Sequence, residues 1–384
     1  MRVVMVTAFP EAPDRIASGP AGVGLNLARA LAALPDLDLE IVVPLGIGGK
    51  EHHARFDGFT VHYLPGRGPA SPAFRYLWTT PRAIARKLAM IDHDIVHIQN
   101  WANFLPRSGK PSVLTIHGIL ERDILYRGRL RWIRSKIMEW TEMRARGRAR
   151  DLILVSPYVR EILGTHLFGR TWDIDNPVAD RFFDVERRPV SGRVLFVGRL
   201  TPLKNVTGMI AGFSILAGRD PSVELRVAGG DSGSGYAEEC RNVAERLGVG
   251  GRVAFLGPVG AEQLFEELST ASGLVLFSFQ ENAPMVVGEA MAAGVPVVAS
   301  RVGGIPSMVE DGVTGRLVDP KDPARLADAL EEVMRPDPGE RMSSQSRLVA
   351  GERFRASVVA GKTYEVYREI LRESARATGS TARR

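Results

Sequence analysis

The sequence predicts an α/β protein with two domains, each built on a parallel β-sheet. Two observations lead to this prediction. Short apolar runs of strand length alternate with helix-length segments in the first half of the chain, and the alternation starts again in the second half. A polar stretch at residues 184–192 separates the halves. The 384 residues suffice for two domains of ordinary size, and two such domains facing each other form a cleft, the usual place for a ligand.

The first domain is predicted to span residues 1–175. Branched aliphatic residues dominate its strand-like runs, and one apolar-periodic segment has helical spacing. The predicted elements are a strand at 2–7, a helix at 22–34, and strands at 39–44, 95–99, 112–117 and 152–156. The connection to the second domain is predicted at residues 174–192, with the boundary near Asp175.

The second domain is predicted to span residues 176–357. A helix is predicted at 206–216 and strands at 194–197, 224–228, 253–256, 274–277, 295–299 and 315–318. A further helical stretch is predicted at 362–373, with apolar residues at helical spacing. Residues 375–384 offer almost nothing to bury and are expected to form a disordered tail.

The composition excludes several classes of protein. A single cysteine, Cys240, rules out an internal disulfide and favours a reducing, cytoplasmic setting. The segment from Arg2 to Phe9 is too short for a signal peptide, and no apolar run reaches the roughly 18 residues of a membrane span. The net charge of +6 comes without a recognition module or stacking platform, so no nucleic-acid partner is expected.

The positive charge gathers between Arg122 and Arg150. Apolar residues at helical spacing lie among the cations, which gives an apolar stripe beside a basic face on a helix at about 129–148: Leu130, Ile133, Ile137 and Trp140. Such a helix suits an anionic membrane surface, and the protein would then be peripheral on the inner face of the membrane. In the alternative, the stripe packs into the core and the arginines are merely solvated.

The most informative segment for chemistry is 278–291, directly after a strand-like run. Glu281 falls at the end of that strand, where open α/β sheets bind their ligands. Asn282 is predicted to cap the following helix and Pro284 to occupy its first turn, so that the helix start directs free amides of Met285 and Val286 at the ligand. Glu289, one turn further, could accept a hydrogen bond from a diol such as a ribose. A carboxylate such as Glu281 next to an anion site would repel a purely anionic ligand. The pairing therefore favours a ligand that carries both hydroxyls and phosphates, such as a nucleotide sugar.

A second cluster follows the strand at 194–197. Arg199 offers a planar fork for phosphate oxygens, and Lys204 offers a mobile point charge. Together these two cations could neutralise a diphosphate leaving group without a metal ion.

With these segments the chain resembles the family-four glycosyltransferases, which are retaining enzymes of the GT-B architecture. The resemblance covers nearly the whole chain, and its specificity comes from the ordered set of motifs. These are Gly22-Val23-Gly24, 115–118, Gly198-Arg199-Leu200 with Lys204, the spacing from Glu281 to Glu289, 289–299, Gly303-Gly304-Ile305-Pro306 and 311–315.

The resemblance implies a role for each matching residue. Arg199 and Lys204 would hold the diphosphate, Glu281 would meet the hydroxyls of the transferred sugar, and Glu289 would take the ribose. The amides of Gly22 and Gly24 would approach the phosphate, and His117 would face the sugar near the reacting carbon. Residues 255–259, with Val259 as the donor-binding residue, would read the base.

One segment departs from the family pattern. Many members have Gly-Phe-Gly where this chain has Asn282-Ala283-Pro284, and proline cannot donate an amide. Asn282 and Ala283 are kept as expected donor-binding residues, but the sugar that they recognise is open. The resemblance also implies that a final helix, about 358–374, returns to the first domain.

The function implied is sugar transfer from a nucleoside diphosphate sugar to a hydroxyl acceptor, with retention and without a metal or other cofactor. The first domain would supply the acceptor side, and polysaccharide or glycolipid assembly is the expected setting, with a lipid-linked acceptor as one option. Glu281, His117, Arg199 and Lys204 are the expected catalytic group. The alternatives are a nucleotide-sugar epimerase or phosphorylase of the same fold and a non-catalytic sugar-nucleotide-binding protein.

Other motifs lead to no site. Gly22 and Gly24 are not followed by the third glycine that a dinucleotide-binding fingerprint requires. Asp92-His93-Asp94 could resemble a metal-binding acidic pair, but it precedes a predicted strand instead of ending one, and we interpret it as a loop. His52-His53 lacks the additional ligands of a metal site. His97 lies in the predicted strand at 95–99, which ends on the cleft side, where an acceptor could lie.

Overall fold

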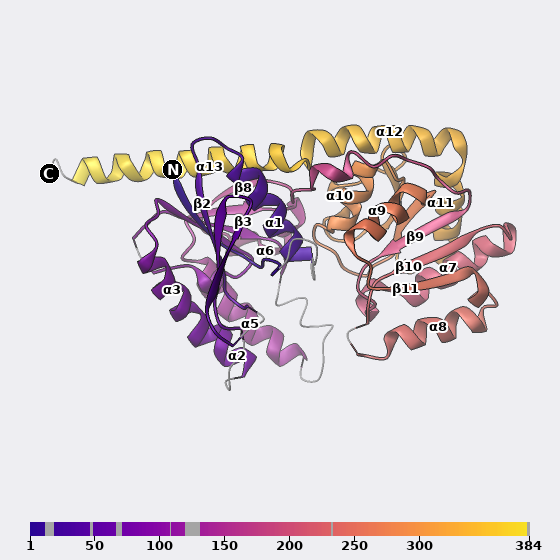
Figure 1. Cartoon of the computed structure of the whole chain (residues 1–384). Coiled ribbons are helices and arrows are strands. Elements are labelled where there is room, and N and C mark those ends of the chain that lie inside the picture. The colour runs from indigo at the N-terminus through magenta and orange to yellow at the C-terminus, as the bar shows by residue number, and fades with distance from the viewer. Residues whose placement is uncertain are drawn as a thin grey trace. The chain divides into compact units, whose positions relative to one another are not determined.

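The computed structural model describes residues 1–11, 19–46, 49–66, 71–107, 109–119, 131–231 and 233–381, apart from the side chains of residues 131, 134 and 378–381. The chain divides into two compact units (Figure 1). Unit 1 holds the described residues up to Pro177 together with those from Ala356 on, and unit 2 holds Val178–Arg355. Each unit is built on one sheet.

Hydrogen bonds explain where the chain leaves unit 1. Asn26 Nδ2, on α1 (Gly19–Ala32), donates to the carbonyl of Pro177 at 3.0 Å, which ties Pro177 to unit 1. The next residue, Val178, donates its N–H to the carbonyl of Phe354 at 2.7 Å and forms a parallel bridge with Arg355. The unit boundaries therefore fall two residues from those predicted near 175 and 357.

Eight strands form the sheet of unit 1, in the order β3-β4-β2-β1-β5-β6-β7-β8. Among the described strands, every neighbouring pair is parallel except β3 with β4. Their bounds are β1 (Arg2–Val6), β2 (Asp38–Val43), β3 (His52–Phe56), β4 (Phe59–Tyr63), β5 (Ile95–Gln99), β6 (Ser112–Ile116), β7 (Asp151–Leu154) and β8 (Arg170–Asp173). The sequence predicted β1, β2, β5, β6 and β7 and missed the other three.

Both faces of this sheet are covered. Val3 and Met5 of β1 belong to one buried cluster, whereas Val4 and Val6 belong to another, as the two-residue period of a strand requires. Among the described residues of unit 1, the helices are α1, α2 (Pro72–Phe74), the π-helix η1 (Arg75–Thr79), α3 (Thr80–Met90), the 3₁₀ turns η2 (Ala102–Phe104) and η4 (Gly164–His166), α5 (Arg131–Arg146), α6 (Pro157–Leu163) and α13 (Ala356–Thr381).

The last helix, α13, packs against the first cluster of unit 1. Val359, Val366, Tyr367 and Ile370 are buried there, which places the expected returning helix of 358–374 in unit 1. The expected disordered tail is wrong for residues 375–381, because they continue α13. Ala375, Arg376 and Ala377 extend the existing helix at little cost even without burial. Residues 382–384 lie outside the described part of the chain.

Six parallel strands form the sheet of unit 2, in the order β11-β10-β9-β12-β13-β14. Their bounds are β9 (Arg193–Val197), β10 (Glu224–Ala228), β11 (Val253–Gly257), β12 (Gly273–Leu276), β13 (Val297–Ser300) and β14 (Gly315–Val318). Val194, Leu195 and Phe196 are all fully buried, because helices cover both faces and a continuous apolar run is then favourable.

In unit 2, the helices are α7 (Val206–Arg219), α8 (Tyr236–Arg246), α9 (Ala261–Thr270), α10 (Met285–Ala293), α11 (Pro323–Met334) and α12 (Pro336–Arg353), with the 3₁₀ turns η5 (Asp180–Phe182), η6 (Pro202–Lys204), η7 (Gly250–Arg252) and η8 (Ile305–Ser307). The helices α7 to α10 each connect two successive strands, whereas α11 and α12 follow β14. In the described part of the chain, no helix is long and apolar enough to cross a membrane.

Candidate active site

The strand order of unit 2 creates a switch point between β9 and β12. The chain runs from β9 outward to β10 and β11, and then returns to the other side of β9 to form β12. Loops that leave neighbouring strands in opposite directions open a crevice at the carboxyl ends of those strands. Arg199 and Lys204 follow β9, and Glu281 follows β12. The topology therefore brings together the two clusters that the sequence analysis proposed separately.

Lys204 and Glu281 form an ion pair at this switch point. Lys204 Nζ donates to Glu281 Oε1, and the same oxygen accepts a hydrogen bond of 2.7 Å from Ser278 Oγ. The side chain of Glu281 is 11% exposed and that of Lys204 is 22% exposed, so the pair is reachable by a ligand but largely shielded from water. The N–H of Phe279 donates to the carbonyl of Leu203 at 2.9 Å and fixes one loop against the other.

Arg199 lies on a rigid backbone and carries an exposed side chain. The flanking residues donate to the end of β10 and to the loop that follows it: Gly198 N–H donates to the carbonyl of Ala228 at 2.9 Å, and Leu200 N–H donates to the carbonyl of Gly230 at 3.0 Å. A Cβ on Gly229 would lie 1.8 Å from the carbonyl oxygen of Gly198, so only glycine permits this approach. The backbone thus holds the start of the Arg199 side chain at the carboxyl end of β9.

Helix α10 starts at the switch point, but its cap differs from the prediction. Pro284, with φ −67° and ψ 121°, is the N-cap residue, and no side chain caps the helix. The predicted capping by Asn282 is therefore wrong, since the proline takes the extended position that precedes the helix. Met285 and Val286 are the first two helical residues, whose N–H groups have no acceptor within the helix. They remain candidates for a bound anion.

Glu289 lies one turn into α10 and is half-buried. Burial disfavours its charged form and raises its pKa to about 7, against a smaller opposing effect of Arg181. A carboxylate held near neutrality can lose its proton when a hydrogen-bond donor arrives. Its predicted contact with a ribose stays a prediction.

Gly303 supports the same site in a way that the sequence analysis missed. It has a φ of +54°, and a Cβ there would lie 1.8 Å from the carbonyl oxygen of Glu281. The N–H of Gly304 donates to that oxygen at 3.2 Å. These two glycines therefore hold the backbone of Glu281. The Gly-Gly pair was visible as a motif, but its long-range contact was not.

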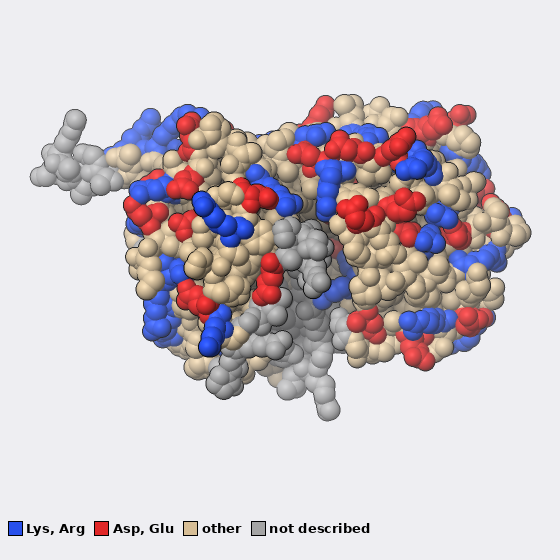
Figure 2. Space-filling view, viewed as in Figure 1, with Lys and Arg blue, Asp and Glu red and all other residues tan. Residues whose placement is uncertain are grey.

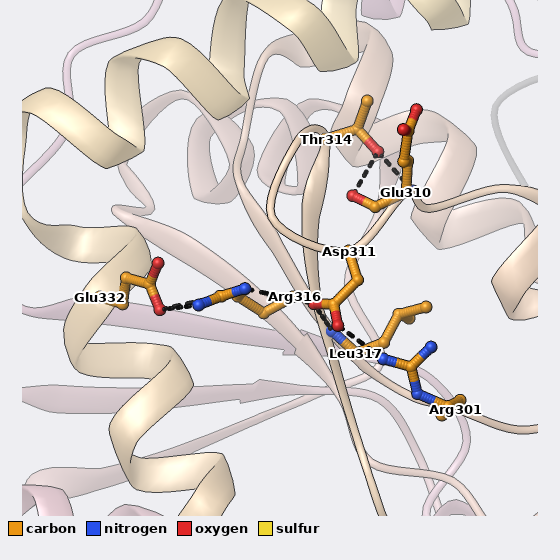
Figure 3. A network of polar contacts seen from close by, with 7 residues as sticks. All are labelled: Arg301, Glu310, Asp311, Thr314, Arg316, Leu317 and Glu332. Carbon is orange, nitrogen blue, oxygen red and sulfur yellow. Dashed lines mark hydrogen bonds and ion pairs between the residues drawn. The ribbon is translucent and has the colours of Figure 1, made fainter.

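The motif at 311–315 has a structural role. Asp311 accepts from the N–H of Leu317 at 3.1 Å and from Arg301 Nη2 at 2.5 Å, while Arg316 bonds to Glu332 at 2.6 Å (Figure 3). Thr314 Oγ1 accepts from the N–H of Glu310 at 2.8 Å. These contacts fasten the turn before β14 to the strand and to α11.

The donor-binding roles of Asn282 and Ala283, which are half-buried before α10, stay predictions. A further donor-binding prediction in unit 2 concerns Val259, which follows β11. Val259 and Phe255 are half-buried and pack against the core of unit 2. Their position at the carboxyl end of the sheet is compatible with reading a base, and this role stays a prediction.

In unit 1, His117 directly follows β6. Its Nδ1 lies 2.9 Å from Asn176 Oδ1, and burial lowers its pKa to about 4, against a smaller opposing effect of that hydrogen bond. His117 is therefore neutral at pH 7 and suited to hydrogen bonding rather than to charge stabilisation. Its predicted position near the sugar stays a prediction.

Gly22 and Gly24 lie inside α1, as its fourth and sixth residues. A Cβ on Gly24 would lie 2.4 Å from the carbonyl oxygen of Ala8, so this glycine lets α1 approach the chain after β1. The sixth residue of a helix donates its N–H to the second. The N–H of Gly24 is therefore used within the helix and is not free to donate to a phosphate, as the prediction required.

His97 is a core residue. Its ring is 1% exposed, with Nδ1 at 2.6 Å from Tyr367 Oη and Nε2 at 2.6 Å from Thr115 Oγ1. The suggested contact with an acceptor is wrong, because both ring nitrogens are engaged. Within the described ranges, no three His, Cys, Asp or Glu side chains are grouped as a metal would need.

Two family models match successive parts of the chain. The model described as Glycosyltransferase Family 4 matches residues 18–178, and the model described as Glycosyl transferases group 1 matches residues 180–348.

Curated relatives match over a shorter range. A D-inositol 3-phosphate glycosyltransferase from Streptomyces griseus subsp. griseus is 40% identical over 189 residues, covering 47% of this chain and 40% of the relative. A D-inositol 3-phosphate glycosyltransferase from Corynebacterium efficiens is 38% identical over 201 residues, covering 50% of this chain and 47% of the relative. The chain thus spans less than half the length of these relatives.

Solved structures match over nearly the whole chain. Sucrose-phosphate synthase from Thermosynechococcus elongatus has a TM-score of 0.82 at 21% identity, covering 97% of this chain and 99% of that one. Anabaena HepE in complex with UDP-glucose has a TM-score of 0.70 at 19% identity, covering 96% and 100%. These likenesses show that the chain has the GT-B fold. The two family models, which together match most of the chain, show that it belongs to glycosyltransferase family four.

Proposed function

We propose that this protein transfers a sugar from a nucleoside diphosphate sugar to a hydroxyl acceptor, with retention and without a metal ion. The observation that carries the proposal is the meeting of Lys204, Glu281 and the start of α10 at one switch point. A cation and helix amides suit a diphosphate, and a carboxylate beside them suits sugar hydroxyls. Anabaena HepE was solved in complex with UDP-glucose, which makes this nucleotide sugar the first donor to test.

The ion pair has a consequence for binding. A diphosphate that reaches Lys204 competes with Glu281 for the same ammonium group. If the sugar of the donor offers its hydroxyls to Glu281, the carboxylate exchanges one charged hydrogen bond for others. Donor binding then rearranges the pair without leaving a buried charge unsatisfied.

The proposed mechanism is a substitution on the same face of the sugar, in which the departing phosphate helps to deprotonate the acceptor. Negative charge grows on the diphosphate as the bond to the sugar breaks. Arg199, Lys204 and the amides of Met285 and Val286 stabilise this charge. Glu281 positions the sugar and contributes electrostatically, since it is already held by Lys204 and Ser278.

For the acceptor, two chemical classes are proposed. Polysaccharide or glycolipid assembly implies a sugar hydroxyl, which can be lipid-linked. A phosphorylated polyol is the second class, because the curated relatives are named as D-inositol 3-phosphate glycosyltransferases.

We also propose that α5 meets an anionic membrane on the cytoplasmic side. Trp132, Ile133, Ile137 and Trp140 are exposed, so the alternative in which this stripe packs into the core is wrong. Leu130 and the basic residues before Arg131 lie outside the described residues. Exposed aromatic residues among cations favour a membrane interface.

Three experiments test the proposed transfer. A screen of nucleotide sugars should find a donor that stabilises the fold, by about 2.7 kcal/mol at a hundredfold excess over its Kd. Release of nucleoside diphosphate only when an acceptor is present would exclude an epimerase, a phosphorylase and a non-catalytic binding protein. Turnover should also survive excess chelator, and strict dependence on added magnesium or manganese would overturn the metal-independent mechanism.

A further inference from the structure

The segment Pro72–Met90 of unit 1, which forms α2, η1 and α3, is unusually basic. It contains four basic residues and no acidic one. Residues 131–150, which include α5, contain seven basic and two acidic residues. The two segments together carry a net charge of +9, whereas the whole chain carries +6, so the rest of the chain is net negative at −3. On the face drawn in Figure 2, basic and acidic side chains are interspersed.

Large apolar side chains are exposed on both segments. Phe74 and Trp78, four residues apart, are 50% and 51% exposed. On α5, Trp132, Ile137 and Trp140 are 66%, 57% and 59% exposed. Three of the five tryptophans of the chain are therefore exposed on these two basic segments. Exposed apolar groups of this size gathered in one region indicate an interaction surface.

The two segments are joined on the same side of unit 1. Tyr76 of η1 donates its hydroxyl to Glu142 of α5. The carbonyl of Tyr76 accepts from Asn103 Nδ2 at 2.8 Å, and its ring lies 5.5 Å from that of Phe104, centroid to centroid. Figure 1 shows α2 and α5 next to each other at the lower end of unit 1. Tyr76 thus points inward and holds η1 against α5.

Cations accompany the exposed rings in both segments. The guanidinium of Arg82 lies 5.4 Å from the ring centre of Trp78, and that of Arg144 lies 5.7 Å from the ring centre of Trp140. At a bilayer surface, a tryptophan ring fits the headgroup level and a cation beside it meets anionic phosphates. The same pairing of ring and cation thus occurs on each segment.

We infer that Pro72–Met90 is a second membrane-contacting element, which shares one anionic bilayer with α5. This inference rests on the membrane contact proposed for α5. The charge favours lipid over a second copy of this chain, because two such surfaces would repel each other. Phe74 and Trp78 enter the interface, while Arg82 and Arg86 lie against the headgroups.

Co-sedimentation with vesicles tests the inference on the full chain. One set of vesicles is phosphatidylcholine alone and the other is an equal mixture with phosphatidylglycerol. The double variant Phe74→Ser with Trp78→Ser should bind the anionic vesicles about tenfold more weakly than the wild type. The control Leu348→Ser removes a residue of unit 2 that is 56% exposed, and it should bind like the wild type. Wild-type binding by the double variant would overturn the inference.

A second measurement covers the case in which the double variant does not fold. Brominated lipid should quench tryptophan fluorescence less in Trp78→Phe, which keeps an apolar ring, than in the wild type. Equal quenching would place Trp78 away from the bilayer. Sedimentation velocity without lipid adds another outcome: self-association that the double variant loses would assign the surface to a second copy and overturn the inference. None of these readouts depends on sugar transfer, so they fail or succeed separately from the proposed activity.

Discussion

The two sheets have matching switch points with different chemistry. In unit 2, the carboxyl ends of β9 and β12 carry Lys204 and Glu281. In unit 1, the corresponding ends of β1 and β5 carry two neutral side chains, Thr7 and Gln99. Thr7 Oγ1 donates a hydrogen bond to Gln99 Oε1 at 2.8 Å. The same topology therefore places an ion pair in one unit and a buried neutral hydrogen bond in the other.

The histidines of unit 1 extend this difference. His117 and His97 both have a lowered pKa, about 4 and about 3, chiefly because burial disfavours the imidazolium. Neither is charged at pH 7. A ligand with a charged diphosphate should therefore draw its affinity from unit 2, and substitutions in the two units should have separable effects.

Lys204→Ala should have the largest effect. Turnover should fall by a factor of roughly 100, equivalent to about 2.7 kcal/mol of lost charge stabilisation on the leaving group. Lys321→Ala removes an exposed lysine of the same unit and serves as the control. Because Lys204→Ala also leaves Glu281 without its cation, the melting temperature of Lys204→Ala should be measured together with its kinetics. Wild-type turnover in Lys204→Ala would end the proposed role.

The two glutamates should separate turnover from nucleotide binding. Glu281→Gln keeps the size and an acceptor oxygen, so turnover should fall while the affinity for free nucleoside diphosphate stays nearly unchanged. Glu289→Ala should weaken nucleoside diphosphate binding by about 1–3 kcal/mol, as a charged hydrogen bond to the ribose is lost. Calorimetry with the free nucleotide and steady-state kinetics measure the two effects.

The opposite pattern would reverse the placement of the donor. If Glu281→Gln loses nucleotide binding and Glu289→Ala keeps it, the roles assigned to both residues must be withdrawn. The calorimetry alone decides this point, since it needs no acceptor.

Tyr367→Phe should test the neutral interior of unit 1. The variant removes the hydroxyl that His97 Nδ1 contacts at 2.6 Å, and a buried polar atom then loses its partner. Unfolding free energy should fall by about 1–3 kcal/mol with turnover per folded molecule unchanged. Tyr364→Phe, one turn earlier and half-buried, is the control. A selective loss of turnover in Tyr367→Phe would connect this core contact to catalysis.

The sequence predicted those parts of the fold that follow from local burial. Val194, Leu195 and Phe196 could be assigned to a buried strand because a parallel strand covered on both faces is apolar throughout. Once these buried strands were assigned, Lys204 and Glu281 could be placed in the loops at their carboxyl ends. The strand β3 was missed because His52, His53 and Arg55 give it no apolar pattern, as its position at the edge of the sheet allows.

Long-range contacts account for the other misses. Nothing near Gly303 in the sequence indicates that it must approach the carbonyl of Glu281. Likewise, His97 could not be assigned to the core without the partner Tyr367, which lies 270 residues further along the chain. The cap of α10 was misassigned locally, since the preference of asparagine for helix N-caps was outweighed by the backbone of Pro284.

The smallest predicted effect concerns the pH dependence of stability in unit 2. The pKa of Glu289 is raised from 4.5 to about 7, chiefly by burial. The folded state therefore holds this proton more tightly than the unfolded state. The stabilisation is fully present below the unfolded pKa and is lost as pH rises through about 7.

Glu289→Gln removes this titration, because glutamine keeps the shape but never ionises. The melting temperatures of variant and wild type should be similar at low pH, should diverge between about pH 4.5 and 7 in favour of the variant, and should then keep a constant difference at higher pH. Each kcal/mol of this difference should shift the melting temperature by about 2–4 °C in a domain of this size. Glu352→Gln, at an exposed position of α12, is the control. Nucleoside diphosphate should then lessen the loss in the wild type but not in the variant, because only an ionised Glu289 gains a charged hydrogen bond from the ribose. A pH-independent difference between the two proteins would mean that Glu289 stays charged in the free protein, and its binding role would then need no proton release.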